Sequence, residues 1–195
     1  SSAASDVYKR QVYTTARELS PTLYSEGTRR AKLANMMAAA MTLTGKGTSF
    51  ILAGEEIART KYGNHNSYNA QDKINALDYY RMQRHKDLFD WYKGLIELRT
   101  KRFTAFADAN VTSWGENYNS ACFSFGCDRT RSTDEYDKVM VVYNAGSSAC
   151  RINFTDSWQL IGNSYLGVIN FDGIETVGNG IVTVPAYTTF ILARK

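Results

Sequence analysis

The spacing of apolar residues changes near residue 104, and this change limits the folds that the 195-residue chain can adopt. Before it, apolar residues recur every three or four positions over residues 25–45 and 84–102, as in amphipathic helices. After it, short strand-like runs alternate with turns rich in Gly, Asn and Asp. The chain is therefore predicted to combine an α/β part with an all-β part.

Short runs of β-forming residues fill the second part of the chain. Turn residues such as Gly178-Asn179-Gly180 separate them, and this spacing favours an antiparallel β-sandwich. Val139–Tyr143 is predicted to be a central strand. The predicted strands are Asn110–Trp114, Cys122–Cys127, Lys138–Asn144, Cys150–Phe154, Trp158–Gly162, Ile181–Val184 and Tyr187–Ala193.

Two amphipathic helices are predicted in the first part. The first covers Ser25–Gly45, with Ser25 as its N-cap and a glycine stop at its end. The second has its core at Asp87–Thr100, with Asp87 placed to cap its start. Their predicted apolar faces are Leu33, Met36, Met37, Ala40 and Met41 in the first helix, and Leu88, Trp91, Tyr92, Leu95 and Leu98 in the second.

A short apolar run, Phe50–Ala53, lies between the two helices and is predicted to be a buried parallel strand. A long polar loop follows from Gly54 to about Lys86, rich in Asn, His, Tyr and Asp. Amide groups and tyrosine side chains suit the hydroxyls and ring faces of sugars. On the residues alone, however, a self-packed loop whose Asn side chains cap its own turns is favoured.

The stretch from Gly47 to Asn75, GTSFILAGEEIARTKYGNHNSYNAQDKIN, resembles the type I pullulanases of the α-amylase superfamily, glycoside hydrolase family 13. The helix motif YxKGLIxLR, from Tyr92 to Arg99, is similar to the same family. Departures from the family pattern are Thr48-Ser49, Glu55 and Asn64. The matching residues of the first stretch are Gly47, Phe50, Ala53, Gly54, Glu56, Arg59, Thr60, Lys61, Gly63, His65, Asn66, Ser67, Tyr68, Asn69, Asp72, Ile74 and Asn75.

The resemblance implies a fold and a domain order. Residues 12–103 would be the end of a catalytic (β/α)8 barrel, with its last helix–strand–helix, and residues 104–195 a C-terminal β-sandwich. The first residues, Ser1–Gln11, resemble a translated sequencing adapter, and we exclude them from the fold prediction. The resemblance implies a C-terminal part of a hydrolase that cleaves α-1,6-glucosidic linkages in pullulan, amylopectin or glycogen with retention of configuration.

The resemblance also implies substrate-binding residues. Asp72 and Asn75 occupy an Asp-x-x-Asn position that helps to bind glucose units on the non-reducing side of the cleavage point, and Asn66 and Tyr68 follow in the HNSYN motif. A carboxylate that accepts from two sugar hydroxyls makes charge-assisted hydrogen bonds. From the residues alone, Asp72 could equally be a helix or turn cap. The expected partner is an α-glucan.

No catalytic residue is expected in this chain. Retaining glycosidases need two carboxyl groups about 5–5.5 Å apart, and in this superfamily they follow earlier barrel strands, with a further Asp in a His-Asp motif. The sequence contains no His-Asp dipeptide. Neighbouring Glu55 and Glu56 would point to opposite faces of a strand, so both are interpreted as structural. No cofactor is expected, although the resemblance allows calcium elsewhere in the enzyme.

Composition and charge argue against other classes of partner. The net charge of +4 is scattered, without a run of basic residues or a nucleic-acid motif, so no nucleic-acid partner is expected. No stretch reaches about 18 apolar residues, so no membrane segment is expected. Cys122, Cys127 and Cys150 have no metal-site spacing and are predicted to be buried thiols. Family members are often secreted or surface-bound and some are intracellular, so the resemblance slightly favours an extracellular or cell-surface location for the whole enzyme, while the sequence itself leaves location open.

Three alternatives remain open from the sequence. A related enzyme of the superfamily, such as an isoamylase or a branching enzyme, would share the barrel. A non-catalytic carbohydrate-binding module would bind glucan on the sandwich through Trp114 and Trp158, and an Asp72→Ala change would leave that binding intact. A structural module would bind no glucan.

Overall fold

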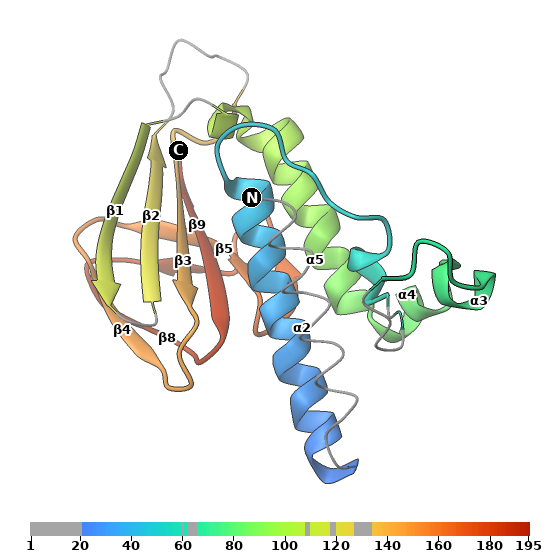
Figure 1. The fold of residues 1–195 in the computed structure, drawn as a ribbon. Coiled ribbons are helices and arrows are strands. Elements are labelled where there is room, and N and C mark those ends of the chain that lie inside the picture. The colour runs from blue at the N-terminus through green and yellow to red at the C-terminus, as the bar shows by residue number, and fades with distance from the viewer. Residues whose placement is uncertain (1–20, 60, 62–65, 108–109, 118–119, 127–133) are drawn as a thin grey trace.

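A computed structural model of the chain describes residues 21–59, 61, 66–107, 110–117, 120–126 and 134–195. Two long helices pack on one face of a large antiparallel sheet, and a second, smaller sheet covers its other face (Figure 1). Ser1–Gln11, His65 and Cys127 lie outside the described residues, as do the side chains of residues 21–28, 114–117, 120, 121 and 123.

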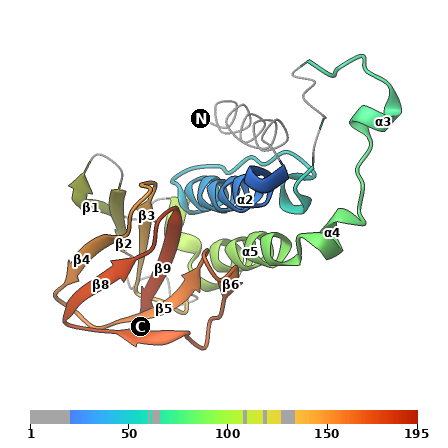
Figure 2. The same ribbon diagram turned by 90° about the horizontal axis from the view of Figure 1, so that it is seen from below.

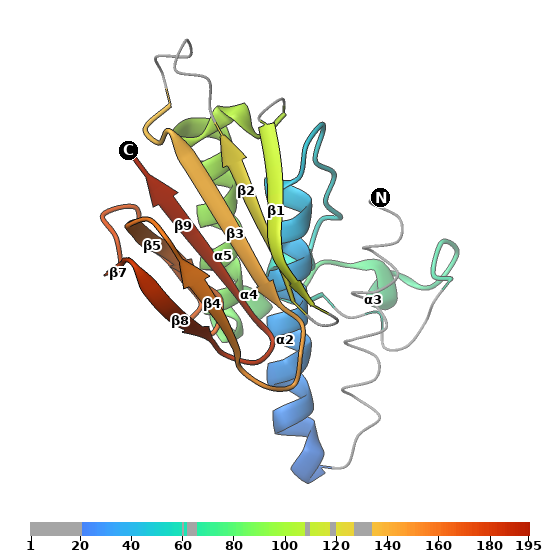
Figure 3. The same ribbon diagram turned by 90° about the vertical axis from the view of Figure 1, so that its left-hand side faces the viewer.

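The large sheet has seven strands, and all its pairs are antiparallel. Its order is β1-β2-β3-β9-β5-β6, with β7 also paired to β5, and Figure 3 shows β3 and β9 at its centre. The smaller sheet pairs β4 with β8. The strands are β1 (Asn110–Asn117), β2 (Ser120–Gly126), β3 (Lys138–Asn144), β4 (Cys150–Phe154), β5 (Trp158–Asn163), β6 (Val168–Ile169), β7 (Glu175–Val177), β8 (Gly180–Val184) and β9 (Thr188–Arg194).

Both faces of the large sheet are buried, because alternate residues of its central strands enter two different cores. In β3, Val139, Val141 and Tyr143 face the helices, whereas Met140 and Val142 face the smaller sheet. Strand β9 divides its side chains in the same way. The predicted antiparallel sandwich and the central position of residues 139–143 are confirmed, and the helices add a third layer.

The two long helices, α2 (Pro21–Thr44) and α5 (Lys86–Glu97), run parallel and side by side (Figure 1). Cross-helix contacts advance along both in the same direction. Lys32 forms a salt bridge with Asp87 (2.9 Å), and farther along the Trp91 Nε1–H donates to the Met36 carbonyl (2.9 Å). Beyond α5, Arg99 donates to the Leu43 carbonyl (2.8 Å), so it satisfies the C-terminal end of α2.

Both predicted helices are present, but their starts differ from the prediction. Helix α2 begins at Pro21, a residue favoured in the first turn of a helix, so Ser25 is not its N-cap. The N-cap of α5 is His85, and the Asp87 carboxylate instead pairs with Lys32. All the predicted apolar residues are buried except Met41, which is half-exposed.

The predicted barrel strand at Phe50–Ala53 is not formed in the described residues. These residues have no regular secondary structure, and the Phe50 side chain is 67% exposed. A parallel strand is formed only by hydrogen bonds to neighbouring parallel strands, and every strand pair in the described part of the chain is antiparallel. The sandwich part of the predicted fold class is therefore confirmed, whereas the described residues contain no barrel strand.

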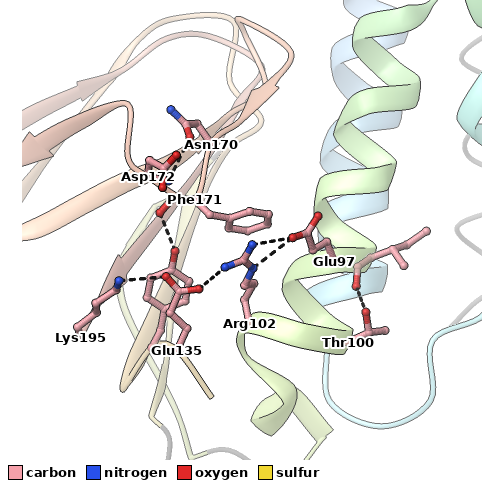
Figure 4. A network of polar contacts seen from close by, with 10 residues as sticks. Glu97, Thr100, Arg102, Glu135, Asn170, Phe171, Asp172 and Lys195 are labelled. Carbon is pink, nitrogen blue, oxygen red and sulfur yellow. Dashed lines mark hydrogen bonds and ion pairs between the residues drawn. The ribbon is translucent and has the colours of Figure 1, made fainter. Parts of the chain in front are cut away.

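A polar network joins the end of α5 to the sheet (Figure 4). The π-helical turn η2 (Leu98–Arg102) ends in Arg102, whose guanidinium bonds Glu97 (2.9 Å) and Glu135 (2.6 Å). Lys195 bonds the second oxygen of Glu135 (3.0 Å). The network therefore ties the helical part, the segment before β3 and Lys195 after β9 to one another.

Candidate functional site

Residues 54–85, here called the polar arm, connect α2 to α5 and carry all the predicted substrate-binding residues. The described residues of the arm form three short helices: η1 (Glu55–Ile57), α3 (Asp72–Asn75) and α4 (Arg81–Arg84). In Figure 2, α3 stands away from the sheet and the two long helices, whereas α4 leads directly into α5. The arm therefore has little packed core of its own, and polar contacts must hold its shape.

A tight turn at Gly54 fixes the start of the arm. Gly54 has a positive φ of 97°, and its N–H donates to the carboxylate of Glu56 (2.9 Å). A Cβ on Gly54 would lie 2.8 Å from side-chain atoms of both Arg59 and Leu77, so only glycine fits. The Glu56 carboxylate closes its own turn, in keeping with the structural role expected for it.

Glu55 faces the helices and not its sequence neighbour. Its carboxylate accepts from the Tyr92 hydroxyl (3.4 Å), and its carbonyl accepts from the Asn35 amide (3.4 Å). The Tyr92 hydroxyl also donates to Asn35 Oδ1 (2.7 Å). Glu55 and Glu56 lie in a 3-10 helix and not in the strand that the sequence argument assumed, but both carboxylates make contacts within the fold.

Asn75 holds the middle of the arm together. Its amide nitrogen donates to the carbonyls of Ser67 (2.7 Å) and Ala70 (3.2 Å), and its side-chain oxygen accepts from the Ser67 hydroxyl (3.0 Å). Lys61 donates to the same hydroxyl (2.6 Å), and the Arg59 guanidinium donates to the Asn75 carbonyl. We call these residues, Arg59, Lys61, Ser67, Ala70 and Asn75, the Asn75 clip.

The clip explains motif residues to which the sequence assigned no role. Arg59, Lys61 and Ser67 belong to the run that resembles pullulanases, and the Ser67 side chain is buried although it lies in a polar loop. Their presence in the motif was the available signal. Their contacts with residues up to 16 positions away could not be inferred from spacing.

The remaining predicted binding residues are exposed on the arm. Tyr68 is 83% exposed, and Asn66 and Asp72 are also exposed. Asp72 is the first residue of α3, after the N-cap Gln71, so it is not the cap that the alternative interpretation required. Tyrosine rings, an amide and a carboxylate together offer a stacking surface and both kinds of hydrogen-bonding group, which are the contacts that a sugar needs.

Basic residues anchor the end of the arm. The Arg81 guanidinium donates twice to the Ala58 carbonyl (3.0 and 2.6 Å), and Ala58 has a positive φ of 55°. Burial lowers the pKa of the His85 imidazole, and the nearby Lys32 and Arg81 lower it further. The arm is therefore attached to the body at both ends, beside Gly54 and beside His85.

The sandwich offers a weaker case for sugar binding. Trp158, one of the two tryptophans expected on a binding sandwich, is 6% exposed and lies in the core between the sheets. Arg194 covers its ring. The Trp114 side chain lies outside the described part of the structure.

Two further properties follow from the described residues alone. Among them, no group of three or more His, Cys, Asp or Glu side chains could hold a metal ion. None of the helices in the described ranges is long and apolar enough to cross a membrane.

Comparison with known proteins relates the chain to one group. A curated pullulanase from Bacillus subtilis (strain 168) is 38% identical over 82 residues, which are 42% of this chain and 11% of that protein. The solved pullulanase from Bacillus acidopullulyticus has a TM-score of 0.73 at 29% identity, over 87% of this chain and 21% of that one. The chain resembles the pullulanases. No protein-family model matches it.

Other pullulanase structures share the fold at lower identity. The type I pullulanase from Bacillus subtilis str. 168, solved with maltose, has a TM-score of 0.73 at 24% identity, over 85% of this chain and 24% of that one. The chain therefore spans about a tenth of the curated relative's length and about a quarter or less of the two solved pullulanases. The predicted resemblance to a C-terminal part of a pullulanase is confirmed.

Proposed function

We propose that the chain is part of a debranching α-glucan hydrolase that cleaves α-1,6-glucosidic linkages in pullulan, amylopectin or glycogen. The observation that carries this proposal is the 38% identity to a curated pullulanase over 82 residues. The fold match at 29% identity supports it. An isoamylase or a branching enzyme is less well supported, because the solved relatives described above are pullulanases.

In this proposal residues 12–103 form the end of the catalytic barrel and residues 104–195 form the C-terminal sandwich. Successive helices of a (β/α)8 barrel lie side by side and parallel, as α2 and α5 do. The boundary falls at η3 (Thr104–Ala107), where helix gives way to strand. The helices and the sheet share one core, so this boundary divides the sequence and not two separately packed bodies.

The proposed ligand is a chain of α-linked glucose units, bound by the exposed side of the polar arm. Asp72 would accept from sugar hydroxyls, the Tyr68 ring would lie against a sugar face, and Asn66 would add an amide. Asn75, proposed with them from the sequence, would position the arm through its clip. The solved pullulanases bound to maltose and to maltotetraose support this ligand class.

Hydrolysis would require a nucleophile and an acid, and in this proposal neither comes from this chain. The two adjacent glutamates, Glu55 and Glu56, bond Tyr92 and the Gly54 N–H and cannot serve as a facing pair. In the proposed enzyme the two catalytic carboxyl groups would lie about 5–5.5 Å apart and act with retention of configuration. We therefore expect this chain to bind glucan without cleaving it.

Titration of the full chain with maltotetraose, followed by calorimetry and by NMR, tests the binding. Asp72→Ala should weaken binding about tenfold or more, because it removes a charge-assisted contact. Lys73→Ala, also exposed and next in sequence, is the matched control and should leave binding unchanged. Unchanged affinity in Asp72→Ala would refute the role of the arm, and release of reducing sugar from pullulan by the pure chain would refute the absence of catalytic residues.

A further inference from the structure

Two cysteines on different sheets face the same core. Cys122 lies in β2 opposite Val142 of β3, and Cys150 is the first residue of β4, opposite Val184 of β8. Opposed residues of an antiparallel pair point to the same face. Val142 and Val184 both belong to the core between the sheets, so both thiols are directed into that core. Cys122 is fully buried in that core, and Cys150 packs against the same core while remaining partly exposed.

The register places the two cysteines at the same end of the sandwich. Asn144 ends β3, two residues beyond Val142 and on the same face. Its amide donates to the Val184 carbonyl (3.0 Å) and to the Ser148 carbonyl (3.0 Å). The Asn144 side chain therefore fixes the turn between β3 and β4. It also links Val184, the residue opposite Cys150, to β3, which pairs with the strand that carries Cys122.

The electrostatic environment supports this proximity. Burial, with a smaller contribution from the neighbouring Cys150 thiol, raises the pKa of the Cys122 thiol to about 12. Both residues carry thiol groups in the structure. A disulfide needs Cβ atoms about 3.5–4.5 Å apart, so the bond proposed below requires the two sheets to approach closely at this end of the sandwich.

We propose that Cys122 and Cys150 form a disulfide that joins the two sheets when the chain meets an oxidant such as glutathione disulfide. The partly exposed Cys150 thiolate attacks one sulfur of glutathione disulfide, forms a mixed disulfide and releases one glutathione thiolate. Cys122, as its thiolate, then attacks the Cys150 sulfur and displaces the second glutathione thiolate. Two protein thiols are oxidised and one glutathione disulfide is reduced to two thiols.

The third cysteine makes the test selective. In an unfolded chain, the short separation of Cys122 and Cys127 favours their pairing, since loop-closure entropy grows with loop length. In the native chain, the proposal requires the longer loop from Cys122 to Cys150 to be the one that closes. The experiment equilibrates the full wild-type chain with oxidised and reduced glutathione, with and without guanidinium chloride, and identifies the linked peptides by mass spectrometry without reduction.

The expected native product is a monomer in which Cys122 is linked to Cys150, whereas the denatured chain should give mainly Cys122–Cys127. Cys127→Ser is the matched variant that should keep the native link, and Cys150→Ala should lose it. A native chain that stays reduced at every glutathione ratio, or that links through Cys127, would overturn the proposal. Because wild-type protein decides the result, a variant that folds poorly does not weaken the test.

Thermal unfolding gives an independent measure. In Cys127→Ser, oxidation should raise the melting temperature by about 5–10 °C, because the link restricts the unfolded chain. Cys122→Ala treated with the same buffer should show no such rise. An oxidised, linked chain that melts no higher than the reduced one would show that the bond strains the two sheets and would refute the inferred fit.

Discussion

At the scale of single residues, the polar arm separates residues that hold its shape from residues that are available to a ligand. Asn75 uses its amide and its side-chain oxygen for contacts within the arm, whereas Tyr68 and Asp72 point their polar groups toward solvent. Sequence spacing treats these three residues alike. Only the fold of the arm brings Ser67 and Ala70 back to Asn75, so their different roles could not be predicted from the sequence.

We predict that Asn75→Ala loosens the arm without unfolding the body. The change removes three side-chain hydrogen bonds, one from the Ser67 hydroxyl and two to the carbonyls of Ser67 and Ala70, and each lost hydrogen bond costs about 0.5–1.5 kcal/mol. Hydrogen exchange should speed up in residues 66–76 and stay unchanged in β3 and β9. Lys73→Ala, at an exposed position on the same arm, is the control. Unaltered protection of residues 66–76 in Asn75→Ala would contradict the role of the clip.

At the scale of elements, α5 approaches β6 closely because it has a glycine at the contact. A Cβ at Gly94 would lie 2.7 Å from Ile169 Cβ and 2.9 Å from its Cδ1. A Cβ atom cannot move without its backbone, so the helix or the strand would have to shift. This contact gives a physical reason for the glycine in the YxKGLIxLR motif, which the sequence matched without explaining.

Gly94→Ala should therefore lower the free energy of unfolding in the wild-type chain and raise it in a variant that lacks the Ile169 side chain. In the wild-type chain, overpacking against Ile169 costs about 1–3 kcal/mol, which outweighs the gain of about 1 kcal/mol from the higher helix propensity of alanine. In Ile169→Gly, which also lacks the Cβ, the clash is removed, and the same change should stabilise the protein. Urea unfolding of the four proteins measures both values. A destabilisation of equal size in both backgrounds would rule out the Ile169 contact as the cause.

The elements also show what sequence patterns can predict. The sequence predicts β3, β9 and α5 because their apolar residues follow the periodicity of a strand or of a helix. The two strands bury both faces, and the helix buries one. The short β6 and β7 were missed, since two or three residues carry too little pattern. The run Phe50–Ala53 has a strand pattern but no strand, because a parallel strand depends on neighbours that its own sequence does not specify.

At the scale of the whole molecule, the helices and the sheet behave as one packed unit. Their common core includes Trp91 and Leu95 from α5 and Val141 and Ile191 from the sheet. Tyr143 of β3 also bonds the Thr44 hydroxyl at the end of α2 (3.0 Å). The Arg102–Glu135–Lys195 network adds a charged tie on the surface of the same junction (Figure 4). A change at this junction should therefore alter the stability of both parts together.

The network also predicts how stability depends on pH. Burial alone would raise the pKa of the Glu135 carboxyl, but hydrogen bonds from Arg102 and Lys195 outweigh it, so the pKa lies below its usual value. The folded state then binds fewer protons than the unfolded state near the ordinary glutamate pKa of about 4.3. The contribution of Glu135 is consequently complete above that pH and is lost as the pH falls through the lower, folded-state pKa.

Glu135→Gln should lower the urea midpoint at pH 7, and its difference from wild type should shrink steadily below about pH 4, where the wild-type carboxylate becomes protonated. Salt should shrink the pH 7 difference as well, because the three charged groups are partly exposed. Glu175→Gln, at an exposed position of β7, is the control. If the unfolding transitions of the helices and of the sheet shift together in Glu135→Gln, the junction couples the two parts. A midpoint difference that stays constant from pH 7 to pH 3 would show that the ionised carboxylate does not stabilise the junction.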